Sequence, residues 1–185
     1  SPAMIEHVSN ITIEDLAVVT NLEAGRAFAE VTAEVVSDSP NAHELDITFE
    51  VGRNQGEPVL GRGAVKLQIE ARRTTTARAL IEIPNAELWS PQKPSLYVVT
   101  ARVAAAAKHL DEWRTRFGLR TVDMNGRHFL LNGKPFRIRG AVDSGYGFEY
   151  ILHSSGVLDD ARRINAAKAA GFNAMIVEGR LPSRP

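Results

Sequence analysis

The sequence contains no cysteine, which excludes disulfide bonds and catalysis by a thiol. It also lacks an excess of either charge: 22 basic and 22 acidic residues cancel, so no net field attracts nucleic acid or an anionic lipid surface. No apolar run approaches the roughly 20 residues of a membrane-spanning helix. The 5 histidines are scattered, without the short spacing of metal ligands. We therefore expect no metal, no cofactor, no nucleic acid and no membrane contact.

What is present is an ordinary globular composition. The 185 residues are 44% hydrophobic and 24% charged, enough for one good core and part of a second unit. The opening Ser1-Pro2-Ala3 resembles an expression tag. We expect residues 1–7 to be a tag or lead-in.

Residues 8–121 consist of short alternating runs closed by turn residues. In residues 44–51 every odd position is apolar and every even position is polar, as in a strand with one buried face. Further strands are expected near residues 11–13, 27–36, 65–69, 77–83, 96–103 and 112–119. About seven strands in about 110 residues indicate an immunoglobulin-like β-sandwich. A jelly roll or a fibronectin-like sandwich stays open, because the Cys-Trp-Cys core of antibody domains is absent.

Two tight-turn signals follow the sandwich. Asn125-Gly126 and Asn132-Gly133 are typical of type I′ turns, whose two central residues both need a positive φ. They flank the short run 127–131. The pattern predicts a compact β-hairpin.

The last third of the chain changes from strand to helix periodicity. Residues 135–142 predict a strand, residues 157–170 a helix and residues 172–177 a second strand. The helix carries an apolar stripe and a candidate C-terminal cap at Gly171; the stripe comprises Leu158, Ala161, Ile164 and Ala167. This order predicts a βαβ unit with parallel strands. One such unit cannot bury both faces of its sheet, so we expect it to belong to something larger.

Four stretches of the sequence, in order along the chain, carry a family resemblance. They are Leu88-Trp89-Ser90-Pro91 with Pro94-Ser95-Leu96-Tyr97, Asp111 with residues 116–120, residues 129–135 with Arg139-Gly140, and residues 170–174. Together they resemble glycoside hydrolase family 2, the group of β-galactosidases, β-glucuronidases and β-mannosidases. The resemblance implies a mainly β chain. It comprises an immunoglobulin-like β-sandwich at 8–121, then a hairpin and the N-terminal fragment of a (β/α)8 TIM-barrel catalytic domain at 122–185.

The sequence also departs from the family pattern near the expected sugar pocket. Ile176 stands where the family usually has an arginine, and residues 140–144 lack the usual asparagine and histidine. These departures indicate an altered pocket. We therefore assign no particular sugar.

The resemblance implies a retaining glycosidase whose two glutamates lie on the fourth and seventh barrel strands. A full barrel takes about 250 residues, so the stretch after the hairpin is too short to close one. We expect no catalytic residue in this chain. The chain by itself is predicted to be inactive.

Sugar-contacting residues are nevertheless expected after the first two barrel strands. Asp143 and Glu178 follow these strands on the C-terminal side, where barrel active sites gather. Neighbouring strands lie about 4.8 Å apart, and Tyr146 in the same loop offers a ring for stacking. We predict that Asp143, Glu178 and Tyr146 contact substrate in the intact enzyme. Loop capping, solvation and packing beneath the loop are the alternatives.

Two functions are compatible with these patterns. The first is a non-catalytic sandwich domain, with the barrel start, of a glycoside hydrolase acting on carbohydrate. The alternative is a stand-alone carbohydrate-binding or adhesion module with 122–185 as a tail. The solvent-facing positions of 44–50 and 66–70 are polar and non-aromatic, which weighs against the alternative. Unpaired barrel strands also predict self-association.

Overall fold

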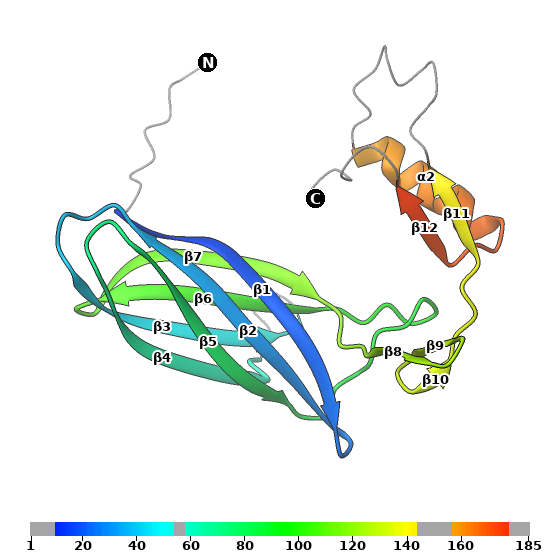
Figure 1. The fold of residues 1–185 in the computed structure, drawn as a ribbon, viewed down its shortest axis with the longest axis horizontal. Coiled ribbons are helices and arrows are strands. Elements are labelled where there is room, and N and C mark those ends of the chain that lie inside the picture. Colours follow the sequence, from blue (N-terminus) through cyan, green and yellow to red (C-terminus); the bar gives the residue numbers. More distant parts are fainter. Residues whose placement is uncertain (1–9, 54–57, 144–156, 178–185) are drawn as a thin grey trace, which may run out of the picture. The chain divides into compact units, whose positions relative to one another are not determined.

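The computed structural model describes residues 10–53, 58–143 and 157–177 (Figure 1). The chain divides into two compact units, Ser1–Thr121 and Val122–Pro185. The first unit contains two antiparallel sheets. The second contains a small antiparallel sheet, a two-stranded parallel sheet and helix α2.

The first unit is the predicted β-sandwich. Its strands are β1 (Ile11–Glu23), β2 (Arg26–Ser37), β3 (His43–Gly52), β4 (Gly61–Ile69), β5 (Thr74–Ile83), β6 (Tyr97–Ala105) and β7 (Lys108–Phe117). One sheet has the order β1-β2-β5 and the other the order β4-β3-β6-β7, with antiparallel neighbours throughout. β4 pairs with β3 and not with β5, unlike the arrangement of a constant-type immunoglobulin domain.

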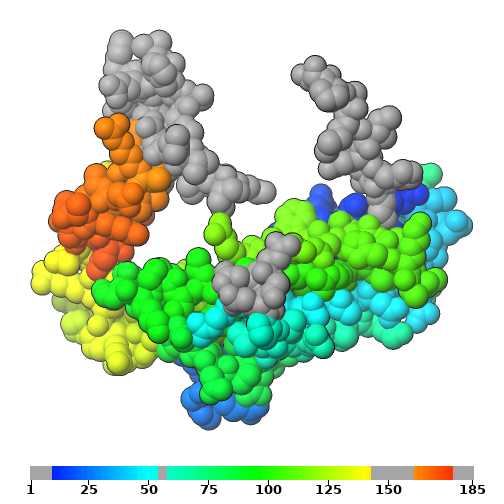
Figure 2. All heavy atoms as spheres, turned by 180° about the vertical axis from the view of Figure 1, so that it is seen from behind, coloured from blue at the N-terminus to red at the C-terminus, as the bar shows by residue number. Residues whose placement is uncertain are grey.

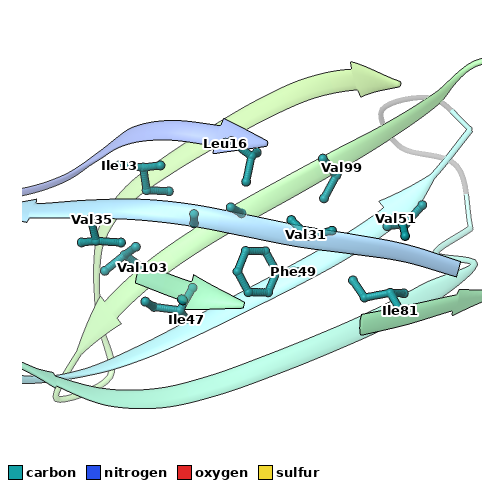
Figure 3. Close-up of a cluster of buried hydrophobic side chains, with 14 of the residues drawn as sticks. Ile13, Leu16, Val31, Val35, Ile47, Phe49, Val51, Ile81, Val99 and Val103 are labelled. Atoms are coloured by element: carbon teal, nitrogen blue, oxygen red, sulfur yellow. The ribbon is translucent and has the colours of Figure 1, made fainter. Parts of the chain in front are cut away.

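The core lies between these two sheets and follows from the alternation in the sequence. In β3 the residues Leu45, Ile47, Phe49 and Val51 are fully buried, while the residues between them face outward. These side chains share one buried hydrophobic cluster with residues of the other sheet, including Val31 of β2 and Ile81 of β5 (Figure 3). The predicted buried face of residues 44–51 is therefore confirmed.

The two sheets also contact each other through strands at their edges. A Cβ atom at Gly61 of β4 would lie 2.5 Å from Cγ2 of Ile81 and 2.6 Å from the carbonyl oxygen of Glu82. Glycine at this position therefore lets β4 approach β5. On the opposite side the Ile13 N–H of β1 donates to Asp111 Oδ2 of β7 at 2.7 Å. This bond lies at the β1 register irregularity that follows Ile13.

The second unit begins with the predicted hairpin, extended by a third short strand. β8 (Val122–Asn125), β9 (His128–Leu131) and β10 (Lys134–Pro135) form an antiparallel sheet in the order β10-β9-β8. Asn132 and Gly133 both have positive φ, 53° and 73°, as a type I′ turn requires. The prediction for this turn is confirmed.

The predicted type I′ turn at Asn125-Gly126 is wrong. Asn125 pairs with His128, so the central turn residues are Gly126 and Arg127. Of these two, Gly126 alone has a positive φ, 59°, which is the pattern of a type II′ turn. The strand register, not the Asn-Gly dipeptide, decides which residues occupy the turn.

The predicted strand, helix and second strand are present as β11 (Gly140–Asp143), α2 (Val157–Ala169) and β12 (Ala174–Val177). β11 and β12 pair in parallel, and their arrows point the same way beside α2 in Figure 1. The predicted single strand 135–142 is divided, because its first residue pairs with β9 in the hairpin sheet. Residues 136–139 connect the two sheets.

The helix uses only part of its predicted apolar stripe. Among the stripe residues whose burial the structure describes, Ala167 is half-buried, whereas Ala161 and Ile164 are exposed. A two-stranded sheet is narrow and covers only part of a helix surface.

Candidate functional site

The carboxyl ends of β11 and β12 form the edge at which sugar-contacting residues were predicted. The parallel register sets Asp143 opposite Val177, the residue that precedes Glu178 in the sequence. The backbone thus brings the ends of the two strands to one edge. The Asp143 side chain, Tyr146 and Glu178 lie outside the described residues, so their contact with substrate stays a prediction.

At the opposite ends of these strands Asn173 joins two segments of backbone. Its Oδ1 accepts a hydrogen bond from the Arg139 N–H at 2.7 Å, and its Nδ2 donates to the Arg137 carbonyl at 2.9 Å. The Asn173 N–H also donates to the Arg139 carbonyl at 2.9 Å. This side chain therefore fixes the segment before β11 to the start of β12. In the sequence, Asn173 is marked only by its place in the stretch 170–174 that carries the resemblance.

A second cluster joins two of the stretches that carried the resemblance, and we call it the Trp89 junction: Trp89, Gly118, Leu119 and Arg120. The Trp89 N–H donates to the Leu119 carbonyl at 2.7 Å. The Arg120 guanidinium lies 4.7 Å from the centre of the Trp89 ring. A Cβ atom at Gly118 would lie 2.9 Å from three Trp89 side-chain atoms. The junction therefore requires glycine at this position.

Strand β1 is hydrogen-bonded to Arg120, the last residue of the Trp89 junction. The Thr20 hydroxyl donates to the Arg120 carbonyl at 2.8 Å, across 100 positions of sequence. Residues 116–120 are thus fixed to Trp89 on one side and to β1 on the other. The tryptophan of the first motif and the glycine and arginine of the second form one structural unit.

Glu87 is the centre of a polar cluster next to this junction. Its carboxylate lies 3.1 Å from Arg53 Nη2 and 2.9 Å from Lys93 Nζ, and it accepts a hydrogen bond from the Ser95 hydroxyl at 3.1 Å. The hydrogen bond from Arg53, with those from Lys93 and Ser95, lowers the pKa of Glu87 to about 2. The Glu87 N–H donates to the Tyr97 hydroxyl at 2.7 Å. The cluster thereby ties the segment before β6 to the end of β3.

We expect Glu87→Gln to flatten the acid dependence of stability. The folded pKa of about 2 lies below the ordinary 4.5, so ionised Glu87 stabilises the fold above pH 4.5, and this contribution is lost as the pH falls towards 2. Urea unfolding at several pH values should show the variant less stable than the wild type at pH 7, with the difference shrinking below pH 4.5 and disappearing as the pH falls through about 2. Glu30→Gln removes an exposed carboxylate from β2 and serves as the control. A stability difference that did not change with pH would contradict the assignment.

Figure 2 shows the molecule from the side of the four-stranded sheet. The outer face of this sheet carries a row of ion pairs. Arg102 of β6 binds Glu50 of β3 at 2.6 Å and Glu112 of β7 at 2.5 Å. The hydrogen bond from Arg102 lowers the pKa of Glu50. Arg62 and Arg114 extend the row at its two ends.

This face lacks a platform for stacking a sugar ring. Among the described residues of β3, β4, β6 and β7, no outward-facing position is Trp, Tyr or Phe. These positions are Glu44, Asp46, Thr48, Glu50, Gly52, Arg62, Ala64, Lys66, Gln68, Val98, Thr100, Arg102, Ala104, His109, Glu112, Arg114 and Arg116. Glycan-binding surfaces commonly use aromatic rings that stack on the sugar. The composition of this face therefore weighs against a carbohydrate-binding module.

A pocket of about 370 Å³ lies at the end of β3 and β4, lined by Ala42, His43, Glu44, Lys66, Leu67 and Gln68. His43 Nε2 is already bonded to the Ser39 hydroxyl at 2.7 Å, and Lys66 Nζ lies 2.8 Å from Asp46. Its lining contains no Trp, Tyr or Phe. The pocket therefore offers few unengaged polar groups and no ring to a ligand.

Within residues 10–53, 58–143 and 157–177, no three histidine, aspartate or glutamate side chains gather as a metal site would require. No helix in the same ranges combines the length and apolarity needed to cross a bilayer.

Known proteins share both the sequence pattern and the fold. Residues 11–120 match the sequence model of the glycosyl hydrolases family 2. Beta-galactosidase 2 of Enterobacter cloacae is 29% identical over 177 residues, which cover 91% of this chain and 17% of that protein. Beta-glucuronidase of Felis catus is 29% identical over 143 residues, covering 62% of this chain and 22% of that protein. The chain thus spans 17% to 22% of the length of these curated relatives.

Solved structures agree on the fold. A GH2 beta-galacturonidase from Eisenbergiella tayi bound to galacturonate superposes with a TM-score of 0.82 at 20% identity, covering 95% of this chain and 30% of that chain. A GH2 member from Bacteroides cellulosilyticus gives 0.83 at 22% identity, covering 95% and 23%. The matched family model covers more than half of the sequence and includes both motifs that meet at the Trp89 junction. The chain therefore belongs to the glycosyl hydrolases family 2.

Proposed function

We propose that this chain is the sandwich domain and the barrel start of a larger glycoside hydrolase, and that it supports glycosidic cleavage without performing it. Family membership supports a carbohydrate substrate for the intact enzyme. The sandwich, at 8–121, is the non-catalytic support. Residues 122–185 are the hairpin and first βαβ unit of the catalytic barrel.

The observation that carries this proposal is an uncovered apolar face on the parallel sheet. Val142 and Ile176 lie directly opposite each other and are 61% and 56% exposed. Ala141 and Met175, on the other face, are half-buried. In a (β/α)8 barrel the helices cover the outer face, and apolar side chains fill the interior. The face of Val142 and Ile176 is therefore the one that would face a barrel interior.

The sheet also lacks neighbours along its edges within the described residues. β11 and β12 pair there only with each other. A two-stranded sheet is marginally stable in water, and unpaired edges tend to recruit further strands. Later strands of the same barrel would pair with these edges. In their absence we propose that the chain self-associates through them.

Glycoside cleavage needs two carboxyl groups on opposite sides of the scissile bond. We propose that the intact enzyme supplies this pair from later strands, as the family resemblance implies. Asp143, Glu178 and Tyr146 would then contact the sugar from the carboxyl ends of β11 and β12. The Trp89 junction and Asn173 serve the same enzyme by fixing the backbone of the sandwich exit and of the barrel start.

The test is hydrolysis of nitrophenyl β-galactoside and β-glucuronide by purified 1–185 and by the intact polypeptide. We expect turnover from the intact polypeptide and none above background from 1–185. Asp143→Asn with Glu178→Gln in 1–185 is the matched control. Turnover by 1–185 that this double variant abolishes would place the chemistry in this chain and overturn the proposal.

A further inference from the structure

One face of the parallel sheet is built entirely from apolar residues. Side chains alternate between the two faces of a strand, and residues opposite each other in the ladder share a face. Gly140, Val142, Ala174 and Ile176 therefore lie on one face of β11 and β12. None of these four described residues has a charged or hydrogen-bonding side chain. The proposed function turns this face towards the interior of the intact barrel.

Val142 and Ile176 are the residues of this face that lie closest to the carboxyl ends of the strands. Each is the third residue of a strand of 4 residues, and the two are directly opposite each other. The arrowheads of β11 and β12 mark this end in Figure 1. Barrel enzymes bind their substrates at the carboxyl ends of the strands. Of the four residues, these two are therefore the pair that a bound sugar would meet, and we call them the apolar wall.

The apolar wall restricts which group of a sugar can lie against it. A hydroxyl that loses its water needs a hydrogen-bond partner, and a carboxylate needs a cation or several donors. The side chains of Val142 and Ile176 supply neither. Asp143 and Glu178, which the proposed function places at the same edge, are acidic and repel a second carboxylate. A sugar carboxylate at this wall would thus lose hydration without gaining a partner.

We propose that Val142 and Ile176 are specificity-determining residues that select a neutral sugar over a uronic acid. This inference rests on the proposed function, because it requires the completed barrel and its glycosidase activity. In a hexopyranose C6 is the carbon outside the ring, so its methylene can contact an apolar wall while its hydroxyl points elsewhere. The C6 group therefore lies against the two side chains. A uronic acid carries its carboxylate at this position.

The experiment measures kcat/KM of the intact polypeptide for substrates that differ only at C6. They are the nitrophenyl β-glycosides of galactose, glucose and mannose and those of the corresponding uronic acids. Within the pair that is hydrolysed, we expect the neutral sugar to be favoured by at least about 100-fold. The 6-deoxy glycoside, with a methyl group at C6, should be cleaved within about tenfold of the neutral sugar, because the wall makes no hydrogen bond to O6.

Two variants assign this preference to the apolar wall. Ile176→Arg places a cation beside the C6 carboxylate and should reduce the preference for the neutral sugar at least about tenfold. Val142→Thr has nearly the same shape, adds one hydrogen-bond donor and should reduce the preference about threefold. Asn165→Arg adds the same charge at an exposed position of α2 and is the matched control. It should leave the preference unchanged.

Uronides cleaved as fast as their neutral counterparts would overturn the inference. So would a preference for the neutral sugar that every folded wall variant retains in full, because other residues would then set it. If Ile176→Arg does not fold, Val142→Thr decides. Failure of the wild-type intact polypeptide to cleave any of these glycosides sinks the proposed function, whereas cleavage without the C6 preference sinks only the role of the apolar wall.

Discussion

Replacing Phe49 by alanine is expected to lower the free energy of unfolding of the sandwich by about 3–5 kcal/mol. Phe49 has no exposed surface and belongs to the core cluster formed by both sheets (Figure 3). Its removal leaves a cavity that the strands on either side, fixed by their hydrogen bonds, cannot fill. Domains of this kind have total stabilities of about 5–15 kcal/mol, so the variant loses a large share of its stability.

Urea unfolding monitored by tryptophan fluorescence measures this loss. Both tryptophans, Trp89 and Trp113, lie in the first unit, so their signal reports the sandwich and not the second unit. Leu80→Ala is the matched control, because Leu80 is exposed on β5. Its expected effect is within about 0.5 kcal/mol. Equal losses at the two positions would show that the cluster around Phe49 is not the core.

Gly118→Ala is expected to destabilise the sandwich by about 2–3 kcal/mol, the cost typical of overpacking. The added methyl group would lie 2.9 Å from Cβ, Cγ and Cδ1 of Trp89, so the indole must move. Movement of Trp89 disturbs its hydrogen bond to the Leu119 carbonyl and its contact with the Arg120 guanidinium.

A double-mutant cycle separates this mechanism from a general loss of backbone freedom. Trp89→Leu removes the ring that the new methyl group meets, so the double variant should lose at least about 1 kcal/mol less than the sum of the single losses. Circular dichroism replaces fluorescence here, because Trp89 is changed. Gly140→Ala, where an added Cβ meets nothing within 4 Å, is the control for alanine in place of glycine. Strict additivity would rule out the Trp89 contact as the cause.

Periodicity alone was sufficient to predict the sandwich and the βαβ unit. The alternation in 44–51 places one set of side chains on one face, and a shift of one residue would expose all of them. The order of strand, helix and strand likewise required a parallel pair, which β11 and β12 form. These features depend on neighbouring residues and can therefore be recognised in a single sequence.

Contacts between distant residues could not be predicted in this way. Trp89 meets Gly118, and Asn173 meets Arg137, only after the strands between them have folded. The motif resemblance marked these stretches without indicating what they contact. For the candidate site, strand order predicted the shared edge at Asp143, whereas the side-chain contacts with a sugar stay a prediction.

Turn geometry was predicted only where it is set by local preference. Asn132-Gly133 adopts the expected turn because both residues tolerate a positive φ. Ala106 and Ala107, between β6 and β7, also have positive φ, 48° and 62°. Alanine does not favour this conformation, so no sequence signal marks it. The pairing of Ala105 with Lys108 leaves two residues for the turn and imposes the geometry.

The bond between Ile13 and Asp111 bears on how the sandwich avoids unwanted partners. An outer strand with free N–H groups invites β-augmentation, the addition of an extended peptide from another molecule. At Ile13 this donor is already occupied by the Asp111 carboxylate, and the register irregularity beside it disrupts the ladder that a foreign strand would need to match. The Asp111 carboxylate, on β7 of the four-stranded sheet, therefore hinders another molecule from adding a strand to β1 at the edge of the three-stranded sheet.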